Sequence, residues 1–331
     1  MRVVQATEFG GPEVLAVREI PDPTPGPGQV VVQVAAADVM FLDTRLRGGW
    51  GSEYFQIETP YVPGGAVAGV VVEVGAEVDP SWIGKRVATS TAASGIGGGQ
   101  PIGGYAEKAL AKVETLNEVP EGLSLEQAVA LVHDGRTALA VFERAAIQAG
   151  EWVLVTAAGG GLGTLLIQLA RSAGAHVVAA ARGRDKLELA ERLGAHAVID
   201  YSEPDWSAKV RAATGGAGVN VVLDGAGGDL GAAATEAIAD HGRFLGYGAA
   251  AGEFAEFDSD SLAVRGISAL GLFDITGADT DWNALARGIQ DAVVAGDIEV
   301  VIGQTFPLEH ADRAHAAIEL RKSLGRTLLT L

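Results

Sequence analysis

The chain opens with short apolar runs and continues with apolar segments that alternate with amphipathic ones. Four runs rich in β-branched residues, separated by Pro, Gly and Asp, predict a β-rich first part; they lie at 30–37, 69–78, 86–89 and 104–112. The proline-rich segment 21–28 is interpreted as a stiff connection between two strands. The glycine-rich segment 94–104 predicts a surface loop.

From about residue 124 the pattern changes. Ser124 and Gln127 have the spacing of a capping box and predict the start of a helix that runs to about residue 148. Beyond it, apolar strands are expected at 152–156, 176–180, 219–223 and 243–247, and helices at 161–173, 185–193 and 230–239. Near-continuous apolar strands that alternate with helices indicate a parallel, doubly wound sheet. The last part is mixed, with helices expected at 281–295 and 309–322 and a strand at 326–331.

The order of these segments predicts two domains. A length of 331 residues exceeds the roughly 250–300 at which one hydrophobic core stops growing. The β-rich parts flank the α/β part, so we expect an α/β fold in which residues 124–261 form a nucleotide-binding domain. Residues 1–123, completed by 262–331, would form the β-rich catalytic domain.

Composition limits the chemistry and the partners. The chain has no cysteine, which excludes disulfides, iron–sulfur clusters, thiolate nucleophiles and cysteine-ligated zinc. Its net charge of −18 predicts no binding to nucleic acid or to anionic membrane surfaces. The first residues lack an apolar leader, and no run of about 18 apolar residues occurs, so we expect a soluble cytoplasmic protein.

A glycine cluster between an apolar strand and an amphipathic helix predicts a dinucleotide site. In VTAAGGGLG, Gly160 allows a tight turn, while Gly161 and Gly163 allow backbone approach to a pyrophosphate and close packing. The backbone N–H groups that begin the helix, at Gly161, Leu162 and Gly163, would hold the phosphates. The alternative is a glycine-rich turn that binds no ligand.

The residues after the second strand favour NADPH over NADH. An NAD site usually has Asp or Glu at the end of this strand, but here Ala181 and Arg182 are followed by Arg184 and Lys186. A cluster of cations suits the 2′-phosphate of NADPH. The alternative is a helix start with solvated basic side chains.

The motif Ala157-x-x-Gly160-x-x-Gly163-x-x-x-x-Gln168 resembles that of the medium-chain dehydrogenase/reductase superfamily. The strongest similarity is to its zinc-independent NADPH:quinone oxidoreductase family. Further segments that resemble this family are FGGPEVL, FLDTRLRGG, PYVPGGAVAGVVVEVG, LGAHAVIDY, VNVVLDGAGG and RKSLGRTLL. The resemblance implies a GroES-like catalytic domain, an inserted Rossmann domain and a homodimer, joined through the nucleotide domain along the strand that contains 243–247.

The resemblance also implies roles for individual residues. Around the cofactor phosphates it implies Gly183, Lys186, Tyr201 and Arg321, and around the nicotinamide Thr137, Tyr247, Gly248, Leu272 and Phe273. Two of these have structural alternatives, since Phe273 could belong to the core and Tyr247 could cap a strand.

The positions that match zinc ligands of related enzymes are Met40, Gly65 and His133. One imidazole and one thioether do not make a tetrahedral zinc site, so we expect no metal. His133 remains a candidate proton donor or substrate anchor, unless Asp134 or a backbone carbonyl simply satisfies it. The resemblance implies an Asn where Met40 stands, which questions an ordinary quinone as substrate.

Without zinc, the protein must orient the acceptor and polarise its oxygen through hydrogen bonds. Conjugated acceptors suit such a site, so we expect hydride transfer from NADPH to a small-molecule quinone or α,β-unsaturated carbonyl. The candidate catalytic residues are Met40, Tyr54, His133 and Thr137, with Trp50 and Tyr61 also expected near the acceptor. For Trp50 and Tyr54, the alternative is a loop-stabilising surface role. Two other functions stay open: an enoyl-thioester reductase of fatty-acid or polyketide type, and a non-catalytic NADPH-binding sensor or structural protein.

Overall fold

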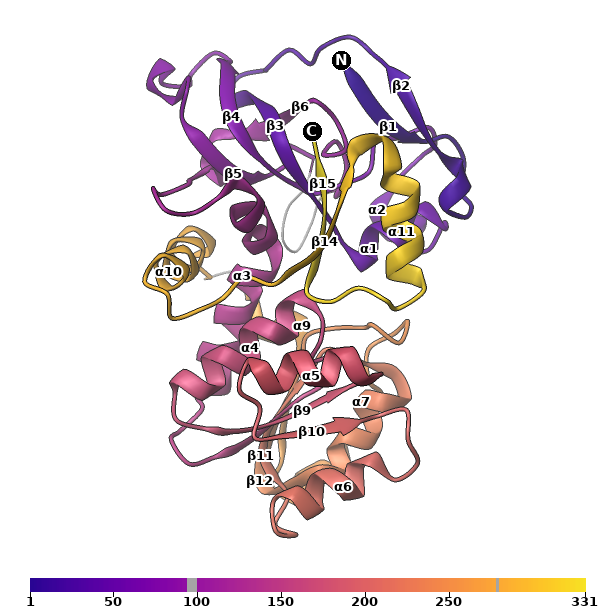
Figure 1. Cartoon of the computed structure of the whole chain (residues 1–331), viewed down its shortest axis with the longest axis vertical. Coiled ribbons are helices and arrows are strands. Elements are labelled where there is room, and N and C mark those ends of the chain that lie inside the picture. Colours follow the sequence, from indigo (N-terminus) through magenta and orange to yellow (C-terminus); the bar gives the residue numbers. More distant parts are fainter. Residues whose placement is uncertain (94–99, 278–279) are drawn as a thin grey trace. The chain divides into compact units, whose positions relative to one another are not determined.

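The computed structural model in Figure 1 describes residues 1–93, 100–277 and 280–331. Their contacts divide the chain into two units. The first comprises residues 1–133, 286–294 and 302–331, and the second comprises residues 134–285 and 295–301. Residues 124–133, expected in the nucleotide-binding domain, cluster with the first unit, while residues 262–285 and 295–301 cluster with the second. Residues 94–99 of the predicted glycine-rich loop lie outside the described residues.

The first unit is built on a mainly antiparallel sheet. Its described strands follow the order β14-β15-β3-β4-β5-β7, and β6 also pairs with β3. β14 and β15 pair in parallel, whereas β1 and β2 form a separate antiparallel ribbon. The bounds are β1 Arg2–Ala6, β2 Leu15–Glu19, β3 Gln29–Val39, β4 Ala66–Val74, β5 Arg86–Ser90, β6 Lys108–Lys112, β7 Asn117–Glu118, β14 Ile302–Pro307 and β15 Arg326–Thr330.

The helices of this unit are short except for the two that continue into the second unit. They are α1 Phe41–Arg47, α2 Ser52–Phe55, α3 Leu125–Ala145, α10 Trp282–Val294 and α11 Ala311–Glu319. The predicted capping box at the start of α3 is confirmed: Gln127 N–H donates to Ser124 Oγ, and Ser124 N–H to Gln127 Oε1, both at 3.1 Å.

A continuous core lies against β3. Valines 30, 32 and 34 lie on one face of the strand and are 3% exposed or less, and the more exposed Gln33 and Ala35 alternate with them from residue 32 on. They belong to one cluster with Tyr105 and with residues of α11 such as Ile318. Because α11 follows β14 in the chain and packs on this core, the C-terminal segment completes the first unit.

The second unit is a six-stranded, all-parallel sheet among the described residues. The strand order is β10-β9-β8-β11-β12-β13, the doubly wound Rossmann order, with the first strand β8 in the middle. Figure 1 shows α4 and α5 on one face of these strands and α6 on the other. The bounds are β8 Trp152–Val155, α4 Gly161–Ser172, β9 His176–Ala181, α5 Arg184–Arg192, β10 Ala197–Asp200, α6 Trp206–Ala213, β11 Val219–Asp224, α7 Gly228–Ala234, β12 Ile238–Gly246, α8 Ser259–Val264, β13 Ser268–Gly271 and α9 Leu272–Ile275.

Two expectations about this sheet are wrong in detail. The helix predicted for 230–239 ends earlier, because β12 begins at Ile238, which pairs with Val219 of β11. The strand expected to join two protomers is β12, but β12 lies between β11 and β13. Both of its edges are already hydrogen-bonded, so the free edge on this side of the sheet belongs to β13.

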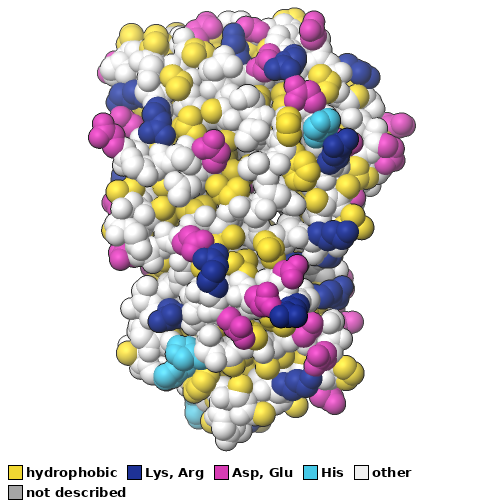
Figure 2. Space-filling view, in the orientation of Figure 1, with side chains coloured by type: hydrophobic (Ala, Val, Ile, Leu, Met, Phe, Trp, Pro, Cys, Tyr) yellow, Lys and Arg dark blue, Asp and Glu magenta, His cyan; other side chains and the backbone are white. Residues whose placement is uncertain are grey.

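The surface shows no continuous basic area on the face in Figure 2. Lys and Arg side chains there are interspersed with Asp and Glu over both units. In the part of the chain that the structure describes, no helix has the length and apolar character needed to cross a membrane.

Candidate active site

The glycine-rich turn joins β8 to α4 in the second unit. Gly160 is the N-cap of α4, and Ala157, three residues earlier, has a φ of 49° in the left-handed region. A Cβ on Gly163 would lie 2.7 Å from the Ala157 carbonyl oxygen and 2.9 Å from Ala158 Cα. Gly163 is therefore required by the packing of the turn itself. A Cβ on Gly160 would only approach the Ala157 oxygen to 3.4 Å, which is ordinary contact.

The first turn of α4 presents free backbone donors. Among the described residues, the N–H groups of Gly161, Leu162 and Gly163 have no hydrogen-bond acceptor. Three donors at a helix N-terminus, aided by the helix dipole, form an anion-binding site. These donors are available to a diphosphate, and their expected contact with the cofactor stays a prediction.

Lys186 lies directly beside this turn. A Cβ on Gly159 would meet Lys186 Cγ at 2.6 Å and Lys186 Cβ at 2.7 Å, so the lysine stem crosses Gly159. The sequence pattern did not single out Gly159, although it begins the run of three glycines. Of the two other basic residues in the cluster, Arg182 is exposed and Arg184 forms an exposed i,i+4 ion pair with Glu188.

The ends of β9 and β10 are tied together next to the cationic cluster. Tyr201 N–H donates to the Ala181 carbonyl at 3.2 Å, and Gly183 N–H donates to Asp200 Oδ2 at 3.1 Å. Partial burial acts to raise the pKa of Asp200, but hydrogen bonds from Ser202 and Gly183 outweigh it and hold that pKa below its usual range. Gly183 and Tyr201 are therefore close to each other, while the expected roles of Gly183, Lys186 and Tyr201 at the cofactor phosphates stay predictions. Asp200 is a further member that the motif did not reveal.

A buried carboxylate organises the carboxyl edge of the sheet. Thr156 donates its hydroxyl to Asp224 Oδ1 at 2.5 Å, and the same hydroxyl oxygen accepts N–H from Gly225 and Ala226. Ala226 and Gly227 also donate N–H to Asp224, which is fully buried. Burial raises the pKa of Asp224, and these hydrogen bonds partly oppose the rise. The sequence pattern singled out neither Thr156 nor Asp224.

Tyr247 and Gly248 follow β12 at the same edge. The Tyr247 hydroxyl donates to the Thr156 carbonyl at 3.4 Å, and its ring lies against Gly225, where a Cβ would be 2.7 Å away. A Cβ on Gly248 would lie 2.6 Å from the Gly225 oxygen. Tyr247 is only 8% exposed, so this geometry serves packing of the turn. Its expected contact with the nicotinamide ribose stays a prediction.

Phe273 is far from buried. It lies on the four-residue helix α9 directly after β13 and is 74% exposed, so the alternative that it belongs to the core is wrong for the isolated chain. Leu272 precedes it and is half-buried. Their expected contact with the nicotinamide stays a prediction.

Helix α3 carries the polar run HDGRT. Arg136 is 4% exposed, and burial lowers its pKa to about 10. His133, Asp134 and Arg136 each take part in interactions, while Thr137 is half-buried. Four ionisable or hydroxyl side chains within five residues of one helix make this the most polar segment of α3.

In the first unit, Met40 precedes α1 as its N-cap residue. Its backbone N–H donates to Asp43 Oδ2 at 2.8 Å, which fixes the start of the helix. The Arg321 guanidinium lies over the Phe41 ring, 4.8 Å from its centroid. Arg321 therefore contacts the helix that follows Met40, and its expected role at the cofactor phosphates stays a prediction.

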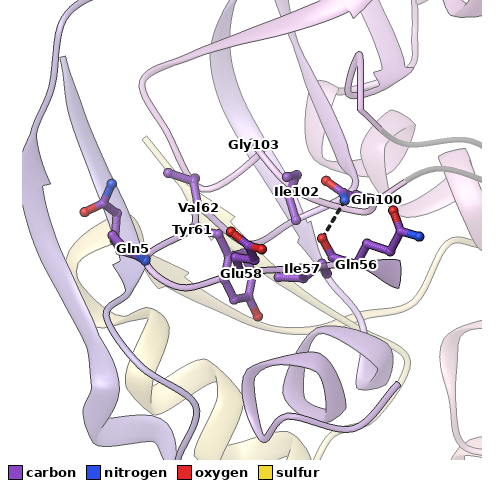
Figure 3. Close-up of a pocket in the computed structure, with 10 residues that line it drawn as sticks. Gln5, Gln56, Ile57, Glu58, Tyr61, Val62, Gln100, Ile102 and Gly103 are labelled. Atoms are coloured by element: carbon purple, nitrogen blue, oxygen red, sulfur yellow. Dashed lines mark hydrogen bonds between the residues drawn. The ribbon is translucent and has the colours of Figure 1, made fainter. Parts of the chain in front are cut away.

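The aromatic residues that follow α1 differ in their surroundings. The Arg45 guanidinium lies 5.4 Å from the centroid of the Trp50 ring, whereas Tyr54 is 77% exposed. Tyr61 is buried and lines a cavity of about 440 Å³ in the first unit. Figure 3 shows Gln5 at one end of this cavity, Gln56 and Gln100 at the other, and Glu58 beside Tyr61. Gln100 donates its side-chain amide to the Gln56 carbonyl at 3.0 Å.

The lining of this cavity indicates what it accommodates. Its apolar walls come from residues such as Ile57, Val62 and Ile102, and its polar side chains carry amides, one carboxylate and the Tyr61 hydroxyl. None of the described residues that line it has a basic side chain, so the lining favours neutral or cationic molecules over anionic ones.

Metal ligands are not assembled in the described part of the chain. Among residues 1–93, 100–277 and 280–331, no three His, Cys, Asp or Glu side chains lie together in a geometry that could hold an ion. Met40 and Gly65 supply no such ligand beside His133.

Comparison with known proteins agrees with this architecture. Residues 26–121 match the family model described as an alcohol dehydrogenase GroES-like domain, and residues 161–290 match that of a zinc-binding dehydrogenase. The chain is 33% identical over 327 residues to a 2-haloacrylate reductase from a Burkholderia species, with 97% of this chain and 96% of that protein covered. It is 31% identical over 330 residues to a quinone oxidoreductase from Pseudomonas aeruginosa, covering 98% of each.

Among solved structures, the mycobacterial protein Rv1454c complexed with NADPH superimposes with a TM-score of 0.88 at 32% identity, with both chains fully covered. A GroES-like unit together with a Rossmann unit is the architecture of the medium-chain dehydrogenases/reductases. Within that superfamily, the chain belongs to the quinone oxidoreductase family of oxidoreductases.

Proposed function

We propose that this oxidoreductase transfers a hydride from NADPH to a quinone or an α,β-unsaturated carbonyl compound, without zinc. The observation that carries the proposal is the Lys186 stem lying across Gly159, beside the three free N–H donors of α4. This arrangement offers a cation and a diphosphate cradle within one short segment.

The residues of the second unit fit NADPH. The N–H groups of residues 161–163 would hold the diphosphate, and Lys186, Arg182 and Tyr201 would surround the 2′-phosphate. Gly183 gives the backbone turn that brings them together, with a φ of 88°. The NADPH complex of the similar mycobacterial protein supports the same choice of cofactor.

When bound, NADPH supplies the hydride, and the residues of the chain orient the nicotinamide and the acceptor. Thr137, Tyr247, Gly248, Leu272 and Phe273 are proposed to orient the nicotinamide, and Arg321 to approach the phosphates. Met40 and Tyr54 are proposed to contact the acceptor, and His133 to donate a hydrogen bond to its oxygen. A quinone or enone spreads the incoming charge onto that oxygen, where a hydrogen bond and then a proton stabilise it.

The donor set argues against catalytic zinc. Of the three matching positions only His133 offers a good zinc ligand, since Met40 has a thioether and Gly65 has no side chain. The similar 2-haloacrylate reductase supports a conjugated acceptor, because the substrate in its name is an activated alkene.

The test is a screen that follows NADPH absorbance with quinones, enones and enoyl thioesters side by side. We expect NADPH oxidation with 1,4-benzoquinone, 9,10-phenanthrenequinone or simple enones, unchanged after dialysis against a chelator. Turnover of crotonyl-thioester alone would instead identify an enoyl-thioester reductase. Tight NADPH binding with no oxidation across the panel would identify a non-catalytic protein.

We also propose a homodimer that uses the free edge of β13 rather than β12. The outward backbone groups of β13 have no partner strand in the described chain, and three of its four residues are exposed. Sedimentation of the wild type and of a Leu270→Pro variant tests this, since proline removes a ladder donor. A monomeric wild type would contradict it. The expected cytoplasmic location stays a prediction.

A further inference from the structure

A chain of hydrogen bonds crosses the interior of the first unit and ends at the start of α1. Arg47 Nη1 lies 3.4 Å from His315 Nδ1, and His315 Nε2 lies 2.9 Å from the Tyr105 hydroxyl. That hydroxyl lies 3.2 Å from Asp43 Oδ2. All four side chains are 2% exposed or less, so water does not compete for these bonds.

The hydrogen bonds in this series can run in only one direction, with each donor on the side of Arg47 and each acceptor on the side of Asp43. Arginine only donates, so His315 Nδ1 must accept from Arg47 and the imidazole proton lies on Nε2. Nε2–H then donates to the Tyr105 oxygen, which leaves the Tyr105 hydroxyl proton for Asp43. Burial, helped by the Arg47 charge, lowers the pKa of His315 to about 3, so the imidazole stays neutral and this order persists at physiological pH.

The series of hydrogen bonds ends at the Asp43 carboxylate, which also accepts the backbone N–H of Met40. Asp43 Oδ2 accepts both the Tyr105 hydroxyl and the Met40 N–H, the latter at 2.8 Å. The other carboxylate oxygen, Oδ1, is buried and has no hydrogen-bond partner among the described residues, and the same is true of the Tyr61 hydroxyl. Asp43 is thus anchored through one oxygen, while the second can take up a proton.

Charged and titratable groups surround Asp43 on every element packed against it. They are Asp38 on β3, Arg47 on α1, Tyr61 after α2, Tyr105 before β6, His315 on α11 and Arg326 on β15. The cations are already engaged, because Arg326 pairs with Asp38 and Arg47 pairs with Glu319. Burial raises the pKa of Asp43 to about 7, with Asp38 adding to the rise and the Met40 and Tyr105 hydrogen bonds opposing it.

We propose that Asp43 is a pH-sensitive positioning residue for acceptor reduction: its ionised carboxylate holds Met40 at the start of α1, and protonation weakens that hold. Hydrogen bonds to an ionised carboxylate are roughly twice as strong as those to a neutral group. Arg47, His315 and Tyr105 form the ordered chain that supports the ionised state. The activity readout rests on the function proposed above, but the structural readout does not.

The activity readout is the dependence of acceptor reduction on pH. With saturating NADPH, kcat/KM for the acceptor falls by up to about tenfold from pH 8 to pH 6, as expected for one group that titrates near 7. The KM for NADPH changes little, because, apart from Arg321, the groups proposed to hold the cofactor phosphates, namely residues 161–163, 182, 186 and 201, lie in the second unit.

The structural readout needs no substrate. The chain has two methionines, Met1 and Met40, and Met1 carries the amino terminus. Protein labelled with ¹⁵N-methionine therefore gives one backbone amide resonance, that of Met40, whose proton Asp43 accepts. We expect this resonance to shift with pH, with a midpoint near 7.

Two variants separate a proton switch from a merely structural role. Asp43→Asn keeps the shape and cannot ionise, so the Met40 resonance no longer titrates and the acid limb of kcat/KM disappears. Tyr105→Phe removes a donor that stabilises the ionised form, so both midpoints move to higher pH. Asp79→Asn, an exposed acid in the same unit, is the matched control and leaves both midpoints in place.

Two results would overturn the inference. One is a Met40 resonance that does not change between pH 5.5 and 8.5, or that titrates equally in Asp43→Asn. The other is an acid limb that persists in Asp43→Asn. If no acceptor is turned over but the Met40 resonance titrates as expected, the proposed function fails while the proton switch at Asp43 stands.

Discussion

Lys186 and Gly159 are in direct contact: the lysine stem occupies the space where any larger residue at 159 would place its Cβ, with Cγ 2.6 Å from that position. Because Cβ and Cγ are the inflexible part of the lysine side chain, Gly159→Ala must displace Lys186. The glycine therefore determines where the positive charge lies beside the turn.

We predict that Gly159→Ala and Lys186→Ala have the same effect on the KM values for the two cofactors. Each raises the KM for NADPH by about tenfold or more, the effect of losing one charge-assisted hydrogen bond of 1.5–3 kcal/mol, with little change for NADH. Steady-state kinetics with both cofactors measures it. The control is Arg184→Ala, because Arg184 is exposed and paired with Glu188. Equal losses for NADPH and NADH would contradict the 2′-phosphate assignment.

Substitutions at Gly163 and Gly160 distinguish a glycine that the packing of the turn requires from one that it does not. A Cβ at 163 would clash with Ala157 and Ala158, so Gly163→Val should displace the turn and abolish NADPH binding. A Cβ at 160 makes only ordinary contact within the chain, so Gly160→Ala should keep the thermal stability of the wild type. Calorimetric titration with NADPH together with a melting curve distinguishes the two. Unchanged affinity in Gly163→Val would show that the turn does not bind the cofactor.

The Thr156 hydroxyl serves three partners at the carboxyl edge of the sheet. Thr156→Val keeps the shape but leaves Asp224 and two backbone N–H groups with fewer partners. We expect a loss of about 1–3 kcal/mol in the free energy of unfolding, since buried polar groups left unsatisfied carry that penalty. Urea unfolding at pH 7 measures it. Thr214→Val serves for comparison, because it removes a hydroxyl that accepts the Gly218 N–H and does not contact Asp224.

Asp43 should also make stability depend on pH. Its folded pKa of about 7 lies above the ordinary aspartate value, so the folded state binds a proton that the unfolded state has released. Stability from this group is therefore full below about pH 4 and declines as the pH rises towards 7, by up to about 4 kcal/mol.

The difference between Asp43→Asn and the wild type isolates this effect. We expect the variant to gain stability relative to the wild type as the pH rises from 4 to 7.5, measured by urea unfolding at each pH. His315 has the opposite dependence, because its lowered pKa makes stability decline as the pH falls from about 6.5 to 3, and it is common to both proteins. A constant difference at all pH values would contradict the raised pKa.

Local patterns sufficed for the parts of the fold that local chemistry determines. The Ser124–Gln127 capping box and an apolar strand at 152–156, observed at 152–155, were predicted because their signals lie within a few residues. The helix predicted for 230–239 was too long because the alanines of this segment favour a helix, whereas Ile238 pairs with Val219 in the sheet. The strand at 197–200 was not predicted, since it is short and half-buried.

The candidate site divides in the same way. The turn at 160–163 and Lys186 follow from spacing along the chain, so the sequence revealed them. Asp43, Tyr105 and His315 are separated by 62 and 210 residues, and nothing in the local sequence of any one of them shows that the three meet. Asp224 was not predicted, because an aspartate at the end of an apolar strand resembles an ordinary loop residue. Only its burial in the structure shows its role.

The Thr156–Asp224 cluster also orders the backbone next to the glycine turn. Because it pins the backbone after β8 to the backbone after β11, the residues that lead into the glycine turn are fixed before any ligand arrives. Ordering a backbone residue takes roughly 1–2 kcal/mol of conformational entropy, so a turn that folding has already ordered spares a ligand that loss. Binding energy from a dinucleotide would then go into affinity rather than into shaping its own site.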